Sequence, residues 1–111
     1  MSMLALRMEL VGILHVADVH ELPRSIRRRK ALKLDIFNEF IARYPDADPK
    51  TLSDWLSRYR GHPTYLKRLL MGAYRHDLDG NDCEPLDHAE REEAARLLTQ
   101  QLGPKLRGKA A

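Results

Sequence analysis

Cysteine is nearly absent from this sequence, and so is any long apolar run. Cys83 is the single cysteine among 111 residues, and one thiol supplies neither a disulfide framework nor a cysteine-based zinc site. No apolar stretch approaches the roughly 18 residues that a membrane-spanning helix needs. Glu9 and Asp18 interrupt the apolar opening segment, and no small-residue cleavage site follows it. We therefore expect a cytoplasmic protein with no membrane partner.

Signatures of catalysis and of metal binding are missing as well. The G-x-x-x-x-G-K, G-x-S-x-G and H-E-x-x-H motifs do not occur. The five histidines follow no zinc spacing. Asp77, Asp79, Asn81 and Asp82 lack the twelve-residue spacing and closing glutamate of a calcium loop. We expect no enzyme activity, no metal, no cofactor and no small-molecule substrate.

Charge is plentiful, and it is segregated along the chain. Thirteen Lys and Arg but only five Asp and Glu lie in residues 24–75, whereas residues 76–102 contain two basic and eight acidic residues. This separation predicts a positive face that suits a polyanion. Such charges can also serve only to solvate helix surfaces, so charge alone leaves both interpretations open.

Apolar spacing predicts helices in the first half of the chain. Residues 3–16 are densely apolar and indicate a helix. The basic stretch that begins at Arg24 leads into a second helix, which should end at Tyr44 because Pro45 disfavours helical dihedrals in the residue before it. Its buried side should consist of Leu34, Ile36, Phe37, Phe40 and Ile41.

Two further helices have clear boundaries. Asp48 and Pro49 suit the cap and the first position of a helix that Gly61 ends. Its apolar residues are Leu52, Trp55, Leu56 and Tyr59, at helical spacing. A helix restarting at His62 and Pro63 should end in a left-handed cap at Gly72.

The remainder of the chain predicts a hairpin and a last helix. The Asp79-Gly80 pair favours a tight turn between two short strands. Asp87 can cap a final helix that buries Ala94, Leu97, Leu98 and Leu102 and ends at residues 103–104, before a flexible basic tail. The fold class is therefore mostly α with a small β-hairpin.

One group of side chains has the chemistry of a nucleic-acid site, because aromatic rings stack on bases and cations neutralise phosphates. It comprises Tyr59, Arg60, Tyr65, Lys67, Arg68 and Arg75. The spacing of Tyr59 favours a position in the core, whereas the spacing of Tyr65 leaves the core and the site equally open. Arg75 could instead form an ion pair with the acidic last helix. The start of the helix at Pro63, next to His62, could also bind an anion through free N–H groups.

Four motifs in order resemble the ProQ/FinO family of RNA chaperones. A-L-K-L-D-I-F at residues 31–37 is similar to the family's R-P-L-K-[IV]-G-I-[FH] segment. L-S-R-Y at 56–59 with G-H-P-T-Y-L at 61–66, and G-A-Y-R at 72–75, are similar to its central blocks. D-L-D-G-N at 77–81 matches its turn.

The resemblance implies an elongated helical domain whose concave basic face binds structured RNA, such as stem-loops with a single-stranded 3′ end. It also implies a role in post-transcriptional regulation by small RNAs in bacteria. It assigns RNA contacts to Lys33, Tyr65 and Arg75, and approximately to Lys50. Ser53 and Ser57 stand where relatives carry arginines. The RNA-binding set expected to compensate or assist includes Arg58, Arg60, Lys67 and Arg68, with Arg27, Arg28, Arg29, Lys30 and His62 as further candidates.

These observations predict residues 1–23 as a divergent, helical N-terminal element, 24–102 as the RNA-binding domain and 103–111 as the tail. We expect Lys33, Tyr65 and Arg75 to converge on one cationic hollow. Two alternatives remain: residues 48–71 could form a DNA-binding helix-turn-helix, or the acidic and basic segments could pair between copies in a protein-interaction module. The sequence does not predict the oligomeric state.

Overall fold

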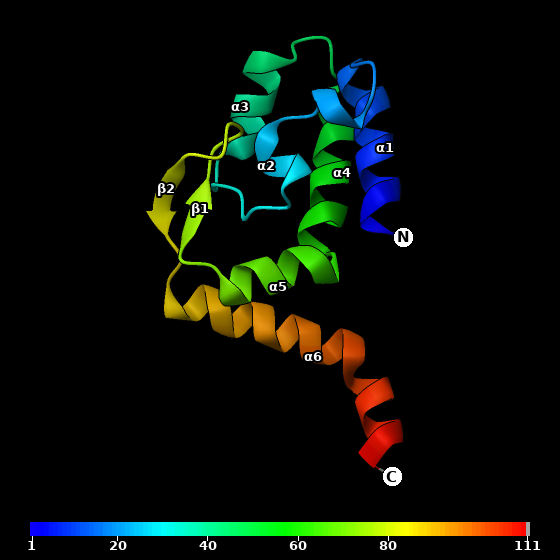
Figure 1. Cartoon of the computed structure of the whole chain (residues 1–111), viewed down its shortest axis with the longest axis vertical. Coiled ribbons are helices and arrows are strands. Elements are labelled where there is room, and N and C mark those ends of the chain that lie inside the picture. The colour runs from blue at the N-terminus through cyan, green and yellow to red at the C-terminus, as the bar shows by residue number, and fades with distance from the viewer. Residues whose placement is uncertain (111) are drawn as a thin grey trace.

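The computed structural model describes the backbone of residues 1–110 and the side chains of residues 1–101. It contains the helices α1 (Met3–Leu14), α2 (Arg24–Arg27), α3 (Ile36–Arg43), α4 (Pro49–Gly61), α5 (Pro63–Met71) and α6 (His88–Ala110), the short 3-10 helix η1 (Val19–Glu21), and the strands β1 (Tyr74–His76) and β2 (Asp82–Pro85). The molecule is elongated, 50 × 28 × 23 Å, with α6 lying across one end (Figure 1). This confirms the mostly helical class with one hairpin. No helix of the described part is long and apolar enough to cross a membrane.

The N-terminal helix belongs to the same core as the rest of the domain. Leu6 and Leu10 of α1 are buried in one apolar cluster with Phe40 and Trp55, and α1 lies beside α4 (Figure 1). The Trp55 indole N–H donates to the Leu6 carbonyl at 2.7 Å, so the buried indole has a partner. The expectation that this segment is helical is confirmed.

The predicted boundaries of α4 and α5 are confirmed at all four ends. The Asp48 carboxylate accepts from the Thr51 backbone N–H at 2.9 Å, with Pro49 in the first turn. The apolar stripe of α4 is buried. Gly72, however, follows α5 with φ −85° and ψ 165°, an extended conformation. The expected left-handed cap is wrong, because Gly72 opens the connection to β1.

The expected helix from Leu34 begins later than predicted. Leu34 precedes α3 and is 69% exposed. Residues 31–33 are instead held in an extended path beside β1, since the Lys33 N–H donates to the His76 carbonyl and the His76 N–H donates to the Ala31 carbonyl. Tertiary pairing with a strand distant in sequence therefore overrides the local helical pattern.

The hairpin is confirmed, with antiparallel strands that pair Tyr74 with Pro85 and His76 with Asp82. Gly80 has φ +90° in the turn, a conformation that favours glycine. The Asp77 carboxylate accepts from the backbone N–H groups of Asp79 and Asn81. Asp77 therefore stabilises the turn itself, whereas Asp79 pairs with Arg43 of α3 at 2.8 Å.

The last helix begins as predicted and continues further. The Asp87 carboxylate accepts from the Glu90 N–H at 2.8 Å, and Ala94 and Leu98 are buried against α5. The predicted end at residues 103–104 is wrong, because α6 continues to Ala110. Proline's fixed φ of about −65° is itself compatible with a helix. The side chains of the basic tail lie outside the described residues.

Candidate nucleic-acid interface

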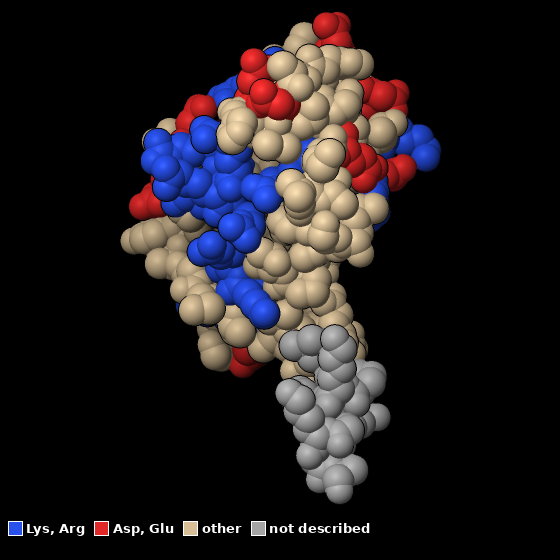
Figure 2. All heavy atoms as spheres, turned by 45° about the vertical axis from the view of Figure 1, so that its right-hand side comes forward, with Lys and Arg blue, Asp and Glu red and all other residues tan. Residues whose placement is uncertain are grey.

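Lys and Arg side chains gather in a band on one face of the molecule, with Asp and Glu along its margins (Figure 2). Ten cations form no ion pair with another described side chain. They are Arg7, Arg24, Arg27, Arg28, Arg29, Lys30, Arg60, Lys67, Arg68 and Arg91. Eight of the ten fall within the basic half of the sequence identified above, and seven of those eight, all except Arg24, were predicted as site residues.

The basic segment Arg24–Lys30 is anchored by its uncharged members. Ser25 and Ile26 are fully buried. The Ser25 hydroxyl donates to the Asp77 carbonyl, and its N–H donates to the Leu78 carbonyl. Because these two residues face inward, Arg27 and Arg28 are left exposed beside them. The sequence run therefore becomes a cationic surface rather than part of a long helix.

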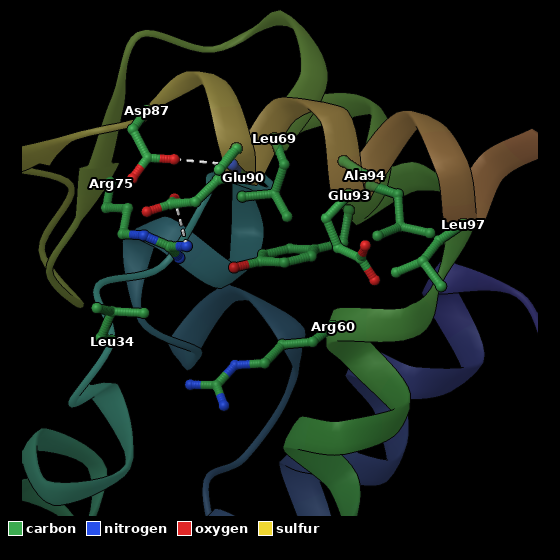
Figure 3. A pocket seen from close by; sticks show the side chains of 12 residues that line it. Leu34, Arg60, Leu69, Arg75, Asp87, Glu90, Glu93, Ala94 and Leu97 are labelled. Atoms are coloured by element: carbon green, nitrogen blue, oxygen red, sulfur yellow. Dashed lines mark hydrogen bonds and ion pairs between the residues drawn. The ribbon is translucent and has the colours of Figure 1, made fainter.

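A hollow of about 430 Å³ lies between α6, α5 and the end of α4 (Figure 3). Arg60 reaches from the end of α4 toward Leu34, across from α6 (Figure 3). The remaining lining residues are Tyr65, Leu66, Leu69, Arg75, Asp87, Ala89, Glu90, Glu93, Ala94 and Leu97. Apolar side chains and three carboxylates thus share the hollow with two arginines. The hollow is therefore of mixed charge, which differs from the cationic hollow expected from the sequence.

Tyr65 and Arg75 meet there around a single backbone unit, that of Leu32. The Tyr65 hydroxyl accepts from the Leu32 N–H at 3.1 Å, and Arg75 donates to the Leu32 carbonyl at 2.8 Å. Arg75 also pairs with Glu90 at 2.6 Å and is only 8% exposed. The alternative of an ion pair with the last helix is therefore confirmed for Arg75. Both side chains hold residues 31–33 in place and only their edges reach the hollow.

Lys33 does not join them. It is absent from the lining of the hollow, and its ammonium lies 2.9 Å from Glu39 and 3.6 Å from Asp35. The hydrogen bond to Glu39 raises the pKa of Lys33. Lys33, Tyr65 and Arg75 were expected to converge, but only Tyr65 and Arg75 do. Lys33 points away from them because successive side chains of an extended segment point to opposite sides.

Comparison with known proteins agrees with this architecture. The family model described as the ProQ/FINO family matches residues 18–110. The chain belongs to the ProQ/FinO family. An RNA chaperone ProQ from Shewanella frigidimarina is 38% identical over 90 residues, which cover 68% of this chain and 44% of that protein. The chain thus spans less than half the length of this ProQ relative.

Solved structures of ProQ/FinO proteins share the fold. A FinO-like RNA chaperone from Neisseria meningitidis superposes with a TM-score of 0.69 at 24% identity, covering 92% of this chain and 83% of the other. A ProQ homolog from Legionella pneumophila gives 0.59 at 21% identity, with coverages of 93% and 85%. The match to the family model begins at residue 18, after α1.

Several predicted contacts of this ProQ/FinO chain already have protein partners. Arg58 donates through both terminal nitrogens to Glu9, at 2.7 and 2.5 Å, and this hydrogen bond lowers the pKa of Glu9. Lys50 is exposed and lies 3.4 Å from Asp54. Ser53 and Ser57 are exposed on α4 and add no charge there.

The start of α5 is likewise occupied. The His62 Nδ1 accepts from the Thr64 N–H at 3.1 Å, and its Nε2 lies 2.9 Å from the Met1 carbonyl. His62 therefore fills the helix terminus that the sequence suggested for an anion. Among the described residues, no group of three or more His, Cys, Asp or Glu is placed to hold a metal.

The sequence reasoning missed Arg7. This residue lies on α1, half-buried, and its Nη1 is 3.5 Å from the Arg27 carbonyl. Its position could have identified it as a candidate, because Arg7 is the one arginine of a helix that is apolar on most sides. Charged residues are rarely buried unless a partner or a ligand compensates their charge.

Proposed function

We propose that this chain binds structured RNA and acts as an RNA chaperone in bacterial post-transcriptional regulation. The observation that carries the proposal is the band of cations that form no ion pair among the described side chains (Figure 2), one of which, Arg60, also lines the hollow. The relatives named RNA chaperones support it. Cationic side chains gain affinity by neutralising phosphates, and they do so for any RNA sequence.

The phosphate grip is assigned to the exposed cations rather than to the paired ones. Arg27, Arg28 and Arg29 together with Lys67 and Arg68 are free to approach a backbone. Lys33 and Arg58 would first have to leave a carboxylate. Because A-form RNA has a major groove too narrow for side chains to read, such a surface recognises shape and phosphate positions.

The hollow suits an unpaired nucleotide. Leu34, Leu69 and Leu97 offer apolar contacts for a base, and Arg60 can approach its phosphate. The carboxylates of Glu90 and Glu93 repel phosphate, yet they can accept hydrogen bonds from ribose hydroxyls, which DNA lacks at the 2′ position. We therefore propose a stem-loop with a single-stranded 3′ end as the preferred ligand class.

A DNA-binding helix-turn-helix fits the arrangement less well. The second helix of such a motif must enter the major groove, but α5 is covered along its length by α6 (Figure 1). Tyr65 and Leu66 of α5 are also buried. The packing of α6 therefore covers one side of α5, which hinders the insertion of α5 into a major groove.

Competition binding tests the proposal. A labelled RNA hairpin with a short 3′ tail is bound to the protein. Three unlabelled competitors are compared: the same tailed hairpin, the hairpin without the tail, and a DNA hairpin of identical sequence with the tail. The proposal predicts that the tailed RNA competes best and the DNA worst. Equal competition by DNA would contradict RNA selectivity, and equal competition by the tailless RNA would contradict the role of the hollow.

A further inference from the structure

His62 joins the start of α5 to Met1. Its Nδ1 accepts from the Thr64 N–H at 3.1 Å, and its Nε2 lies 2.9 Å from the Met1 carbonyl oxygen. His62 is the N-cap residue of α5, which begins at Pro63. Because proline has no N–H, Thr64 carries the first backbone donor of the helix that needs a partner. We call these two ring contacts the His62 bridge.

The two partners of the ring together determine its protonation state. An imidazole nitrogen that accepts a hydrogen bond carries no proton, whereas a nitrogen that bonds to a carbonyl oxygen must carry one. The Thr64 donor therefore requires a bare Nδ1, and the Met1 acceptor requires a protonated Nε2. Only one neutral tautomer of His62 can form the bridge. The imidazolium donates from both nitrogens and cannot accept from Thr64.

The surroundings of the ring also disfavour a positive charge. The N-terminus of a helix carries a partial positive charge, so a cation at the N-cap is repelled. A hollow of about 400 Å³ is lined by His62 together with Arg58 of α4 and Gln101 of α6. Arg58 is the charged side chain among the other described residues of this lining, and Glu9 of α1 pairs with it. Protonation of His62 would add a second cation to this hollow.

We infer that the His62 bridge is a pH-sensitive contact, which holds the first turn of α5 while His62 is neutral and releases it when His62 is protonated. Histidine is the side chain that ordinarily changes charge between about pH 5 and 8. The release acts on Tyr65, which follows Thr64 in this turn and accepts from the Leu32 N–H. The inference does not depend on RNA binding, so failure of the proposed function would leave it standing.

Protonation of His62 changes stability in one direction. The folded protein holds the ring neutral, whereas the unfolded chain leaves it free to take up a proton, so the contribution of the bridge is present at alkaline pH and is lost as the pH falls. His76 and His88 differ, because each lies beside a carboxylate, at 3.1 and 2.6 Å, where protonation creates an ion pair. The stability of the whole protein therefore combines opposite effects, and the test must observe His62 itself.

NMR of the wild-type protein tests the inference at the two residues concerned. Correlation of ring protons with ring nitrogens identifies which nitrogen of His62 carries the proton, and we expect Nε2 at about pH 8. Hydrogen exchange of the Thr64 amide is expressed as a protection factor, so that the intrinsic pH dependence of exchange cancels. Between about pH 8 and pH 5 this factor should fall about two- to thirty-fold, which corresponds to the loss of an N-cap.

Two substitutions separate capping from protonation. His62→Asn retains a capping oxygen that does not titrate, so the protection of Thr64 should be the same at both pH values. His62→Ala removes the cap, so the protection should be low at both. The matched control is His20→Asn, at an exposed histidine of η1, which should keep the wild-type pH response. Urea unfolding followed by the fluorescence of Trp55 verifies that each variant is folded.

Three outcomes would overturn the inference. A proton on Nδ1 of His62 at about pH 8 would mean that Thr64 does not donate to this ring. Equal protection of Thr64 at both pH values in the wild type would mean that protonation does not release the turn. An equal fall in the wild type and in His62→Asn would assign the pH response to another group. The first two outcomes are read from the wild type and need no variant.

Discussion

Replacing Arg75 by alanine should destabilise the fold before it affects RNA binding. The change removes the hydrogen bond to the Leu32 carbonyl at 2.8 Å and the ion pair with Glu90 at 2.6 Å. Hydrogen bonds to charged groups contribute about 1.5–3 kcal/mol each. Glu90 is 26% exposed in its side chain and can be rehydrated, so the expected loss is about 2–3 kcal/mol in total. For a domain of this size that corresponds to a fall in Tm of about 10–20 °C.

Urea unfolding followed by the fluorescence of Trp55, the single tryptophan, measures this loss. The matched control is Arg96→Ala, because Arg96 also pairs with a glutamate on α6 but in an exposed position, and its midpoint should stay at the wild-type value. RNA binding is measured in parallel at a temperature where both variants are folded. A midpoint for Arg75→Ala equal to that of the wild type, together with lost RNA binding, would refute the structural role.

Three other substitutions test separate parts of the structure. Tyr59→Phe removes a buried hydroxyl without a partner, so the free energy of unfolding should stay equal or rise by up to about 1 kcal/mol; a clear loss in urea unfolding would show that the hydroxyl has a partner in solution. Leu34→Glu alters an exposed residue of the hollow and should leave stability within about 0.5 kcal/mol. It should weaken binding of a tailed RNA hairpin more than of a tailless one, and equal weakening would argue against the hollow. The pKa of Glu9 is lowered in the folded state by Arg58, so its contribution to stability is present at neutral pH and disappears as the pH falls below about 4.5, through the folded pKa. Glu9→Gln should therefore reduce the decrease in urea midpoint between pH 7 and pH 3, and an identical decrease in both proteins would contradict the pair.

Local chemistry explains which parts of the fold the sequence predicted. The caps at Asp48 and Asp87 and the left-handed turn at Gly80 each depend on neighbours within four residues. The apolar stripe of α4 follows from helical periodicity alone. The four motifs at residues 31–81 were enough to indicate the family.

Long-range contacts explain the errors. Residues 31–33 are extended because they pair with His76, more than forty positions away, and no local pattern encodes that pairing. Lys33 is an exception, because its ion-pair partner Glu39 lies only six positions further along the chain. Arg7 was overlooked because its partial burial and its contact with the Arg27 carbonyl arise only when α1 packs into the domain. The residue types of the candidate site were therefore predicted from the sequence. Only the tertiary structure shows which of these side chains have protein partners and which have none among the described residues.

Mapping of backbone amide shifts in isotopically labelled protein, titrated with a tailed RNA hairpin, identifies the residues that the RNA contacts. We expect the largest changes in the basic segment Arg24–Lys30, in α5 and around Arg7, together with the hollow beside Leu34. Changes confined to the acidic outer surface of α6 or to α3, with the basic segment unaffected, would contradict it.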